Sequence, residues 1–161
     1  MQKILFVISQ LYKGGAETSL VNLLNRLDYS KYSVELLVLD QRPVPNAISL
    51  IERVNNKVTI CDAYAEYQKI TFRDRVRAKL IYTYEQKGAY YFTALDFVRG
   101  KEYDWAFFVG EWCSPSFVAY EVNARFKAAW IHSDISKADY FDAGHYYYFF
   151  DSRECLDTKI K

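Results

Sequence analysis

The 161 residues are enough for one well-buried core, and 51% of them are hydrophobic, so we expect a single folded globular domain. The 21 basic and 20 acidic residues nearly cancel, which argues against a general nucleic-acid-binding protein, because such a protein needs a basic surface. Three scattered cysteines and two histidines make a disulfide framework or a metal site improbable, so we expect no metal and no other cofactor.

The N-terminus and the apolar stretches predict where the protein resides. No apolar stretch approaches the roughly 20 residues that are needed to span a bilayer. A single lysine precedes a five-residue apolar run at the N-terminus, which is not the pattern of a signal peptide. We therefore expect a cytoplasmic protein.

The first 40 residues have the pattern of a βαβ unit. Residues 4–8 are β-branched or aromatic without alternation, as in a parallel strand that is buried on both faces. Residues 16–27 place their apolar side chains on one side of a helix, and residues 32–39 have the composition of a second strand. The connection between the two strands should be right-handed.

The middle of the chain predicts further short elements. Two prolines mark a loop at residues 40–46, after which Asn46 is expected to cap a short helix through Arg53 that buries Ile48, Ile51 and Val54. We expect a strand at residues 57–60, then two helices over residues 64–99, separated near Gly88.

The last third predicts three strands, at residues 105–109, 128–131 and 146–150, and a helix that starts at Ser114 and Pro115. Because strands and helices alternate, the sequence predicts an α/β fold. Its sheet should be open, mostly parallel and Rossmann-like, with helices on both faces, in one domain of residues 1–161.

Gly14 and Gly15 are the most informative local feature. They stand between the first predicted strand and the first helix, where backbone N–H groups and the helix dipole favour an anionic ligand. Glycine has no Cβ, so a ligand can approach the main chain closely. The alternative is a plain tight turn. Glu17 follows in the first helical turn, where a carboxylate also complements the dipole without any ligand.

Ligands of open α/β sheets bind beyond the carboxyl ends of the strands. This rule selects Glu111 and Trp112 after the strand at 105–109, and His132 and Asp134 after the strand at 128–131. Each has a simpler explanation, such as an exposed loop acid or a histidine that fixes a loop. The dinucleotide motif GxGxxG, the phosphate loop GxxxxGK[ST] and the hydrolase motif GxSxG are absent.

Residues 69–87 carry six basic and two acidic side chains around an apolar row at helical spacing. Such a basic amphipathic helix is able to lie on an anionic membrane or to bind an acidic partner. The alternative is a helix that packs its apolar row in the core and exposes an ordinary solvated face.

Several segments, taken in order along the chain, resemble the N-terminal domain of family 4 glycosyltransferases of the GT-B fold. These segments are KILFVI (3–8), GGAETSL (14–20), YDWAFFV (103–109) followed by Glu111, AWIHSD (129–134) and YFFDS (148–152). The resemblance covers essentially the whole chain. It implies retaining transfer of a sugar from a nucleotide-sugar donor to a glycan or lipid-linked acceptor, without a metal.

The resemblance also implies roles for individual residues. Gly14 and Gly15 would lie near the donor diphosphate, with Glu17 close by. His132 would be the catalytic residue at the reaction centre, hydrogen-bonding the sugar or the acceptor. Some relatives in this family contact membranes through a basic helix, which favours peripheral contact through residues 69–87 at the inner face of the membrane. The acceptor pocket would be lined by Glu111, Trp112 and Asp134.

The C-terminal domain, which in that family holds the nucleotide-sugar, is missing from this sequence. We therefore expect very weak donor binding and no turnover by these 161 residues alone. Two other hypotheses remain open: a non-catalytic binding or interaction module of the same fold, and a small nucleotide-binding domain with an unusual turn. The sequence does not identify the sugar, the acceptor or the oligomeric state.

Overall fold

The described part of the chain folds around a five-stranded sheet in which every paired strand is parallel, in the order β3-β2-β1-β4-β5. The computed structural model describes residues 1–84, 90–110 and 117–132. The strands are β1 (Gln2–Ile8), β2 (Tyr32–Val38), β3 (Thr59–Asp62), β4 (Tyr103–Val109) and β5 (Ala124–Trp130). The predicted α/β class with an open parallel sheet is therefore confirmed.

Strand β1 is the central strand of the sheet. Its residues 4–8 are all buried, and alternate side chains enter two separate apolar clusters. Leu5 and Val7 belong to one cluster, whereas Ile4, Phe6 and Ile8 belong to the other. The continuous apolar run is thus explained by burial on both faces, as its lack of alternation predicted.

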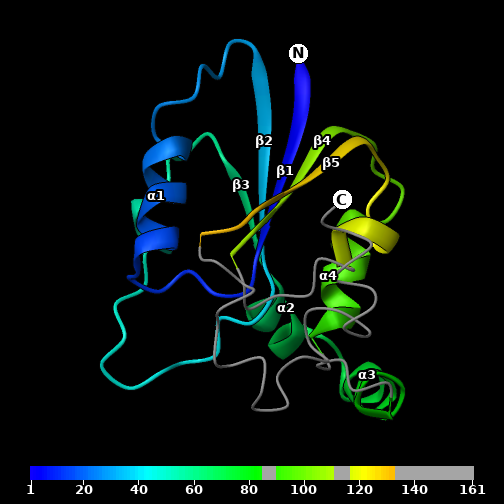
Figure 1. The fold of residues 1–161 in the computed structure, drawn as a ribbon. Coiled ribbons are helices and arrows are strands. Elements are labelled where there is room, and N and C mark those ends of the chain that lie inside the picture. Colours follow the sequence, from blue (N-terminus) through cyan, green and yellow to red (C-terminus); the bar gives the residue numbers. More distant parts are fainter. Residues whose placement is uncertain (85–89, 111–116, 133–161) are drawn as a thin grey trace, which may run out of the picture.

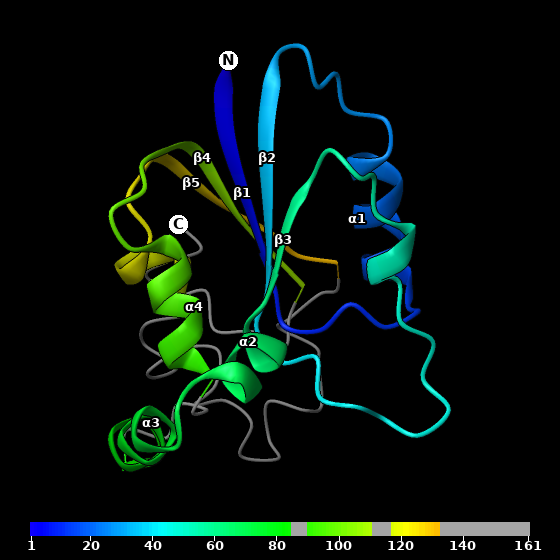
Figure 2. The same ribbon diagram turned by 180° about the vertical axis from the view of Figure 1, so that it is seen from behind.

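Helices cover both faces of the sheet. Helix α1 (Gly15–Leu24) stands on one side, and α2 (Ala63–Lys69) and α4 (Tyr91–Val98) stand on the other (Figure 1). Figure 2, seen from behind, shows the same arrangement. Helix α1 buries Leu20, Val21 and Leu24 against its face of the sheet.

Helix α3 (Phe72–Tyr84) lies apart from these layers, beside α4 and at the end of the molecule toward which the strands run (Figure 1). The sequence predicts two helices between residues 64 and 99, but the described residues form three. The chain turns extended at Ile70, and Thr71 then accepts a hydrogen bond from the Asp74 N–H (3.2 Å), which starts a new helix.

The predicted short helix after Asn46 is also wrong. Asn46 has a φ of +63°, and only a single turn of 3-10 helix forms, at Ile51–Arg53. Val54 is buried as expected, but Ile48 is 53% exposed. Apolar residues spaced three apart suggested a helix, whereas the left-handed turn directs the chain along the β1–α1 loop instead.

Some predicted elements lie outside the described residues, namely the break near Gly88, the helix start at Ser114 and Pro115, and the strand at 146–150. A short π-helix (Phe117–Glu121) precedes β5, which spans more residues than the predicted 128–131. Among the described residues, no helix has the length and apolar character that a membrane crossing requires.

Candidate functional site at the carboxyl edge of the sheet

The carboxyl ends of all five strands point to the same edge. The chain moves from β1 through α1 to β2 on one side of β1, while β4 pairs with β1 on the other side. The carboxyl ends of β1 and β4 therefore form the switch point, where open α/β sheets bind their ligands. The candidate residues are best judged by their distance from this point along the edge.

Hydrogen bonds hold the β1–α1 loop in one conformation. Leu11 is fully buried, and its N–H donates to the Oε1 of Gln41 (2.7 Å). The Lys13 N–H donates to the Ile48 carbonyl (2.8 Å), and the Leu50 N–H donates to the Leu11 carbonyl (2.8 Å). This short ladder fixes the segment that leads into Gly14.

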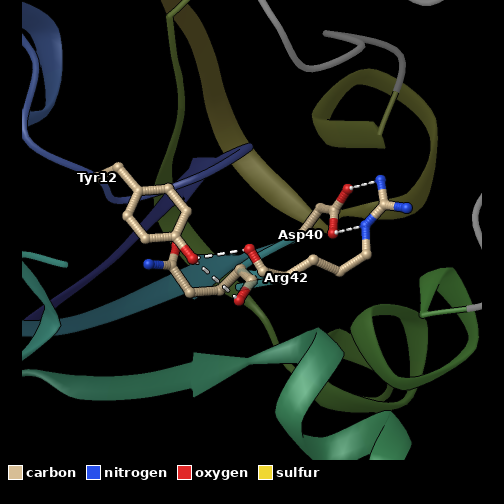
Figure 3. Close-up of polar contacts among 4 residues, drawn as sticks. Tyr12, Asp40 and Arg42 are labelled. Atoms are coloured by element: carbon tan, nitrogen blue, oxygen red, sulfur yellow. Dashed lines mark hydrogen bonds and ion pairs between the residues drawn. The ribbon is translucent and has the colours of Figure 1, made fainter. Parts of the chain in front are cut away.

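The residues after β2 brace the same loop from the other side. The Tyr12 hydroxyl donates to the carbonyl of Arg42 (2.7 Å), and the Asp40 carboxylate pairs with the Arg42 guanidinium (2.7 and 2.6 Å), as Figure 3 shows. Asp40 is buried, and its hydrogen bonds and charge raise the pKa of Arg42. The charged pair therefore anchors the loop that Tyr12 contacts.

Gly14 and Gly15 stand at the start of α1, next to this braced loop. Gly14 is the N-cap with an extended backbone (φ −147°), and its residue type provides no side-chain cap. Neither glycine has a positive φ. A Cβ on Gly15 would have no atom within 4 Å, so neither backbone conformation nor packing requires glycine at that position.

The Glu17 side chain folds back toward Gly14. Its carboxylate lies where a Cβ on Gly14 would stand. A carboxylate in the first turn is stabilised by the helix dipole, so this acid occupies the position that favours an anion. A phosphate arriving at the same N–H groups would compete with the Glu17 side chain.

His132 lies two residues after the end of β5, and its side chain is exposed. Its ring stacks on that of Trp130, with 5.0 Å between the centroids and 28° between the planes. Because β5 is parallel to β4, and β4 to β1, His132 stands at the same edge as the glycine pair. The two strand spacings from β1 to β5 amount to roughly 10 Å.

A pocket of about 520 Å³ opens beside the braced loop. Its polar lining comes from the ends of β1, β2 and β3 and from the segment that connects β2 to β3, and includes Tyr12, Gln41, Ser49, Glu52 and Asp62. Sequence reasoning treated the segment after β2 as a plain loop and missed this lining. The sequence does contain a signal for this lining. Asp40, Gln41 and Arg42 directly follow a buried strand, and ligands of open α/β sheets bind beyond the carboxyl ends of strands.

The structure thus places Gly14, Gly15, Glu17 and His132 along one edge. Glu111, Trp112 and Asp134 lie outside the described residues. Within residues 1–84, 90–110 and 117–132, no group of three or more His, Cys, Asp or Glu side chains is arranged to hold a metal ion.

Comparison with known proteins provides no family for the chain. Neither the models of known protein families nor the curated proteins include a match. Any assignment of function therefore rests on the geometry of the edge and on the residues themselves.

Proposed function

We propose that this chain is the acceptor-side half of a retaining glycosyltransferase of the GT-B type. In this proposal a nucleotide-sugar donor binds between this domain and a second, nucleotide-binding domain, and the sugar passes to a glycan or lipid-linked acceptor. The parent enzyme would act in the cytoplasm, and these 161 residues alone would be inactive.

The observation that carries the proposal is the presence of glycine at position 15, at the start of α1. In the middle of a helix glycine is less stable than alanine by roughly 0.5–1 kcal/mol. Gly15 is the first residue of α1, where a Cβ would meet no atom within 4 Å and φ is not positive, so the fold gives no reason for glycine there. An advantage other than folding therefore explains the glycine. The close approach of a diphosphate to the α1 N–H groups is such an advantage.

The pocket beside Tyr12 adds support for a hydroxyl-rich acceptor. Carboxylate, amide and hydroxyl groups from Glu52, Gln41 and Ser49 line it, and such groups hydrogen-bond sugar hydroxyls. His132 lies farther along the same edge, after β5 and two strands from β1.

The first test is an NMR titration of the chain with pyrophosphate and with nucleoside diphosphates. The backbone amides of Gly14, Gly15 and Ala16 should show the largest shifts, at millimolar ligand because the second domain is absent. The amides at the start of α4 serve as the control for nonspecific anion binding. Largest shifts at α4 or elsewhere, or no shifts at all, would remove the basis of the proposal.

The second test is sugar transfer by this chain joined to a nucleotide-sugar-binding domain. His132→Ala should lower kcat about 100-fold, since loss of one hydrogen-bond donor at a reaction centre has that effect. Lys31→Ala, at an exposed position in the α1–β2 connection, should leave the rate unchanged. Full activity of His132→Ala would reject the role given to this histidine. If the glycine amides respond but no transfer occurs, a non-catalytic binding module is the better description.

A further inference from the structure

A second cavity, of about 420 Å³, lies near the amino ends of β1, β2 and β4, at the end of the sheet where Figure 1 marks N. This is the end opposite the glycine pair. Strands β1 and β2 contribute Lys3, Ser33 and Glu35 to the lining, and residues 100–103 at the turn from α4 into β4 contribute the rest. The volume lies within the range of small-molecule sites, roughly 300–1,000 Å³. The proposed sugar transfer uses none of these residues.

One wall of this cavity carries a carboxylate among core side chains. Glu35 stands on β2 two positions before Leu37, which is fully buried. Its Oε2 accepts a hydrogen bond from the Tyr103 hydroxyl (2.7 Å) and another from the Lys101 ammonium (2.8 Å). Within the described residues, no donor contacts the other oxygen, Oε1. A partly buried ion pair is weak evidence for stability, because desolvation offsets the attraction, so folding alone does not account for Glu35.

The partner of this carboxylate is also held in place. Gly100, with a φ of +72°, turns the chain sharply after α4, and the Lys101 N–H donates to the Val98 carbonyl (3.2 Å). The Lys101 ammonium then lies 3.6 Å from the centre of the Phe97 ring, which attracts the cation. Because the ring and Glu35 already fix this ammonium, a ligand that binds beside it orders few side chains.

The charges that line the cavity balance, with two ammonium groups from Lys3 and Lys101 and two carboxylates from Glu35 and Glu102. Lys3 is exposed and, among the residues that the structure describes, forms no ion pair. It is the register partner of Ser33, and Glu35 follows two residues later on the same face of β2. A simple anion would meet both carboxylates, and a simple cation would meet both ammonium groups. A ligand that carries both charges avoids either repulsion.

We propose that this cavity binds a small zwitterion with the chemistry of a free α-amino acid. Its carboxylate would accept hydrogen bonds from the Lys3 ammonium and the Ser33 hydroxyl, and its ammonium group would donate to Oε1 of Glu35 and to Glu102. The rest of the cavity would hold the side chain of the amino acid. This binding does not depend on sugar transfer and is tested without it.

The experiment is an NMR titration of the chain with L-alanine, and with L-glutamine, which fills more of the cavity. At millimolar concentration either amino acid should shift the backbone amides of Ser33 and of residues 100–103, and the shifts should saturate. N-acetyl-L-alanine lacks the ammonium group and L-alaninamide lacks the carboxylate. Each should bind at least about tenfold more weakly than L-alanine, because each loses a charge-assisted hydrogen bond.

Two variants test the partners of the zwitterion. Lys3→Gln changes an exposed side chain and should weaken L-alanine binding about tenfold, and Glu35→Gln should do the same. Lys31→Gln is the control for the first, since Lys31 is exposed near the same end of the sheet but does not line the cavity. Glu66→Gln is the control for the second, since it also breaks a pair with a lysine (2.6 Å) away from this cavity. Both controls should bind as the unchanged chain does, and circular dichroism should show all variants folded.

Four results would overturn the proposal. The first is the absence of saturable shifts with either amino acid, and the second is equal binding of N-acetyl-L-alanine or L-alaninamide. The third is a loss in the control variants that equals the loss in Lys3→Gln. The fourth is that the largest shifts occur at Gly14 and Gly15, since the zwitterion would then bind at the carboxyl edge. The response of those two amides to pyrophosphate tests sugar transfer separately.

Discussion

At the scale of single residues, Gly15 indicates the candidate site because the fold does not require glycine at that position. Gly100 and Gly110 have φ values of +72° and +95°, so the backbone itself requires glycine there. Gly15 begins a helix with ordinary geometry and open space on its Cβ side. Gly15 and Gly100 look alike in the sequence, but the backbone conformation requires glycine only at Gly100.

This difference predicts opposite effects of alanine at the two positions. Gly15→Ala should raise the free energy of unfolding by about 0.5 kcal/mol, because alanine restricts the unfolded chain and fits a helix. Urea denaturation measures this, and the NMR titration with pyrophosphate should show weaker binding.

Gly100→Ala is the matched control, since its Cβ would also meet no atom within 4 Å. Its left-handed φ should make alanine destabilising by about 1 kcal/mol, with pyrophosphate binding unchanged. A Gly15→Ala protein that is less stable than the parent chain would show that the fold, not a ligand, selects glycine there.

At the scale of elements, one buried side-chain amide helps to hold the loop between β1 and α1. Gln41 accepts the Leu11 N–H and holds the loop against the end of β2. A backbone N–H that is buried without a partner costs about 1–3 kcal/mol, more than most surface contacts contribute. The β1–α1 loop is thus held in part by a residue that is 30 positions away in sequence.

Gln41→Leu should therefore lower the free energy of unfolding by about 2 kcal/mol, because leucine fills similar space but accepts no hydrogen bond. Thermal and urea denaturation measure the change. Ser49→Ala is the control: its hydroxyl makes only longer contacts of 3.3 and 3.4 Å, so its effect should stay within about 0.5 kcal/mol. Equal stability of the two variants would mean that another acceptor or water replaces Gln41.

The helices show what local patterns encode and what they leave open. The spacing of the apolar residues in 16–27 predicted α1 and most of the face that it buries. Leu20, Val21 and Leu24 are buried, whereas Leu23, which the sequence places on the same side, is exposed. The spacing of Phe72, Val76 and Leu80 predicted a shared face equally well. It did not say that this face points away from the core, since that depends on how α3 contacts α2 and α4.

The start of α3 has a recognisable signal in the sequence. Thr71 and Asp74 form a cap-like pair three residues apart, and this pair divides the predicted long helix into α2 and α3. By contrast, the left-handed turn at Asn46 has no unambiguous local signal, because a helix cap and a positive φ both favour asparagine.

At the scale of the whole molecule, the alternation of strands and helices predicted the α/β class and the carboxyl edge. Strand order was not predictable from local pattern, since parallel strands pair through crossovers and any two apolar strands are chemically compatible. The pairing of β1 with β4 creates the switch point, and it brings residues near Gly14 to the same edge as His132. Sequence alone predicted that Gly14, Gly15, Glu17 and His132 lie at this edge, but it predicted neither their order nor the pocket lining after β2.

The sheet also holds two buried groups that resist ionisation. Burial raises the pKa of the Cys61 thiol to about 12 from its ordinary value of 9.0. Burial and the hydrogen bond to Glu35 (2.7 Å) raise the pKa of the Tyr103 hydroxyl above its ordinary 10.0. Both groups stay protonated in the folded chain at pH values where the unfolded chain loses these protons.

This predicts that the folded state loses stability in alkali. Below pH 9 both groups are protonated in the folded and unfolded chains, so their contribution to stability is complete. Above pH 9 the unfolded chain releases the Cys61 proton first, and the free energy of unfolding falls by up to about 1.4 kcal/mol per pH unit for each group that ionises only when unfolded. Urea denaturation between pH 7 and about pH 10.5 measures this slope.

Cys61→Ala and Tyr103→Phe should each reduce the alkaline slope, because neither replacement ionises. Lys69→Gln is the control: Lys69 is a surface residue paired with Glu66 (2.6 Å), so its removal should leave the slope between pH 9 and 10 essentially unchanged. Alkylation followed by mass spectrometry provides an independent check, since the Cys61 thiol should react with iodoacetamide far more slowly in the folded chain than in urea. Rapid alkylation of folded protein at pH 8, or an alkaline slope that both variants leave intact, would contradict a protonated thiol buried beneath α2.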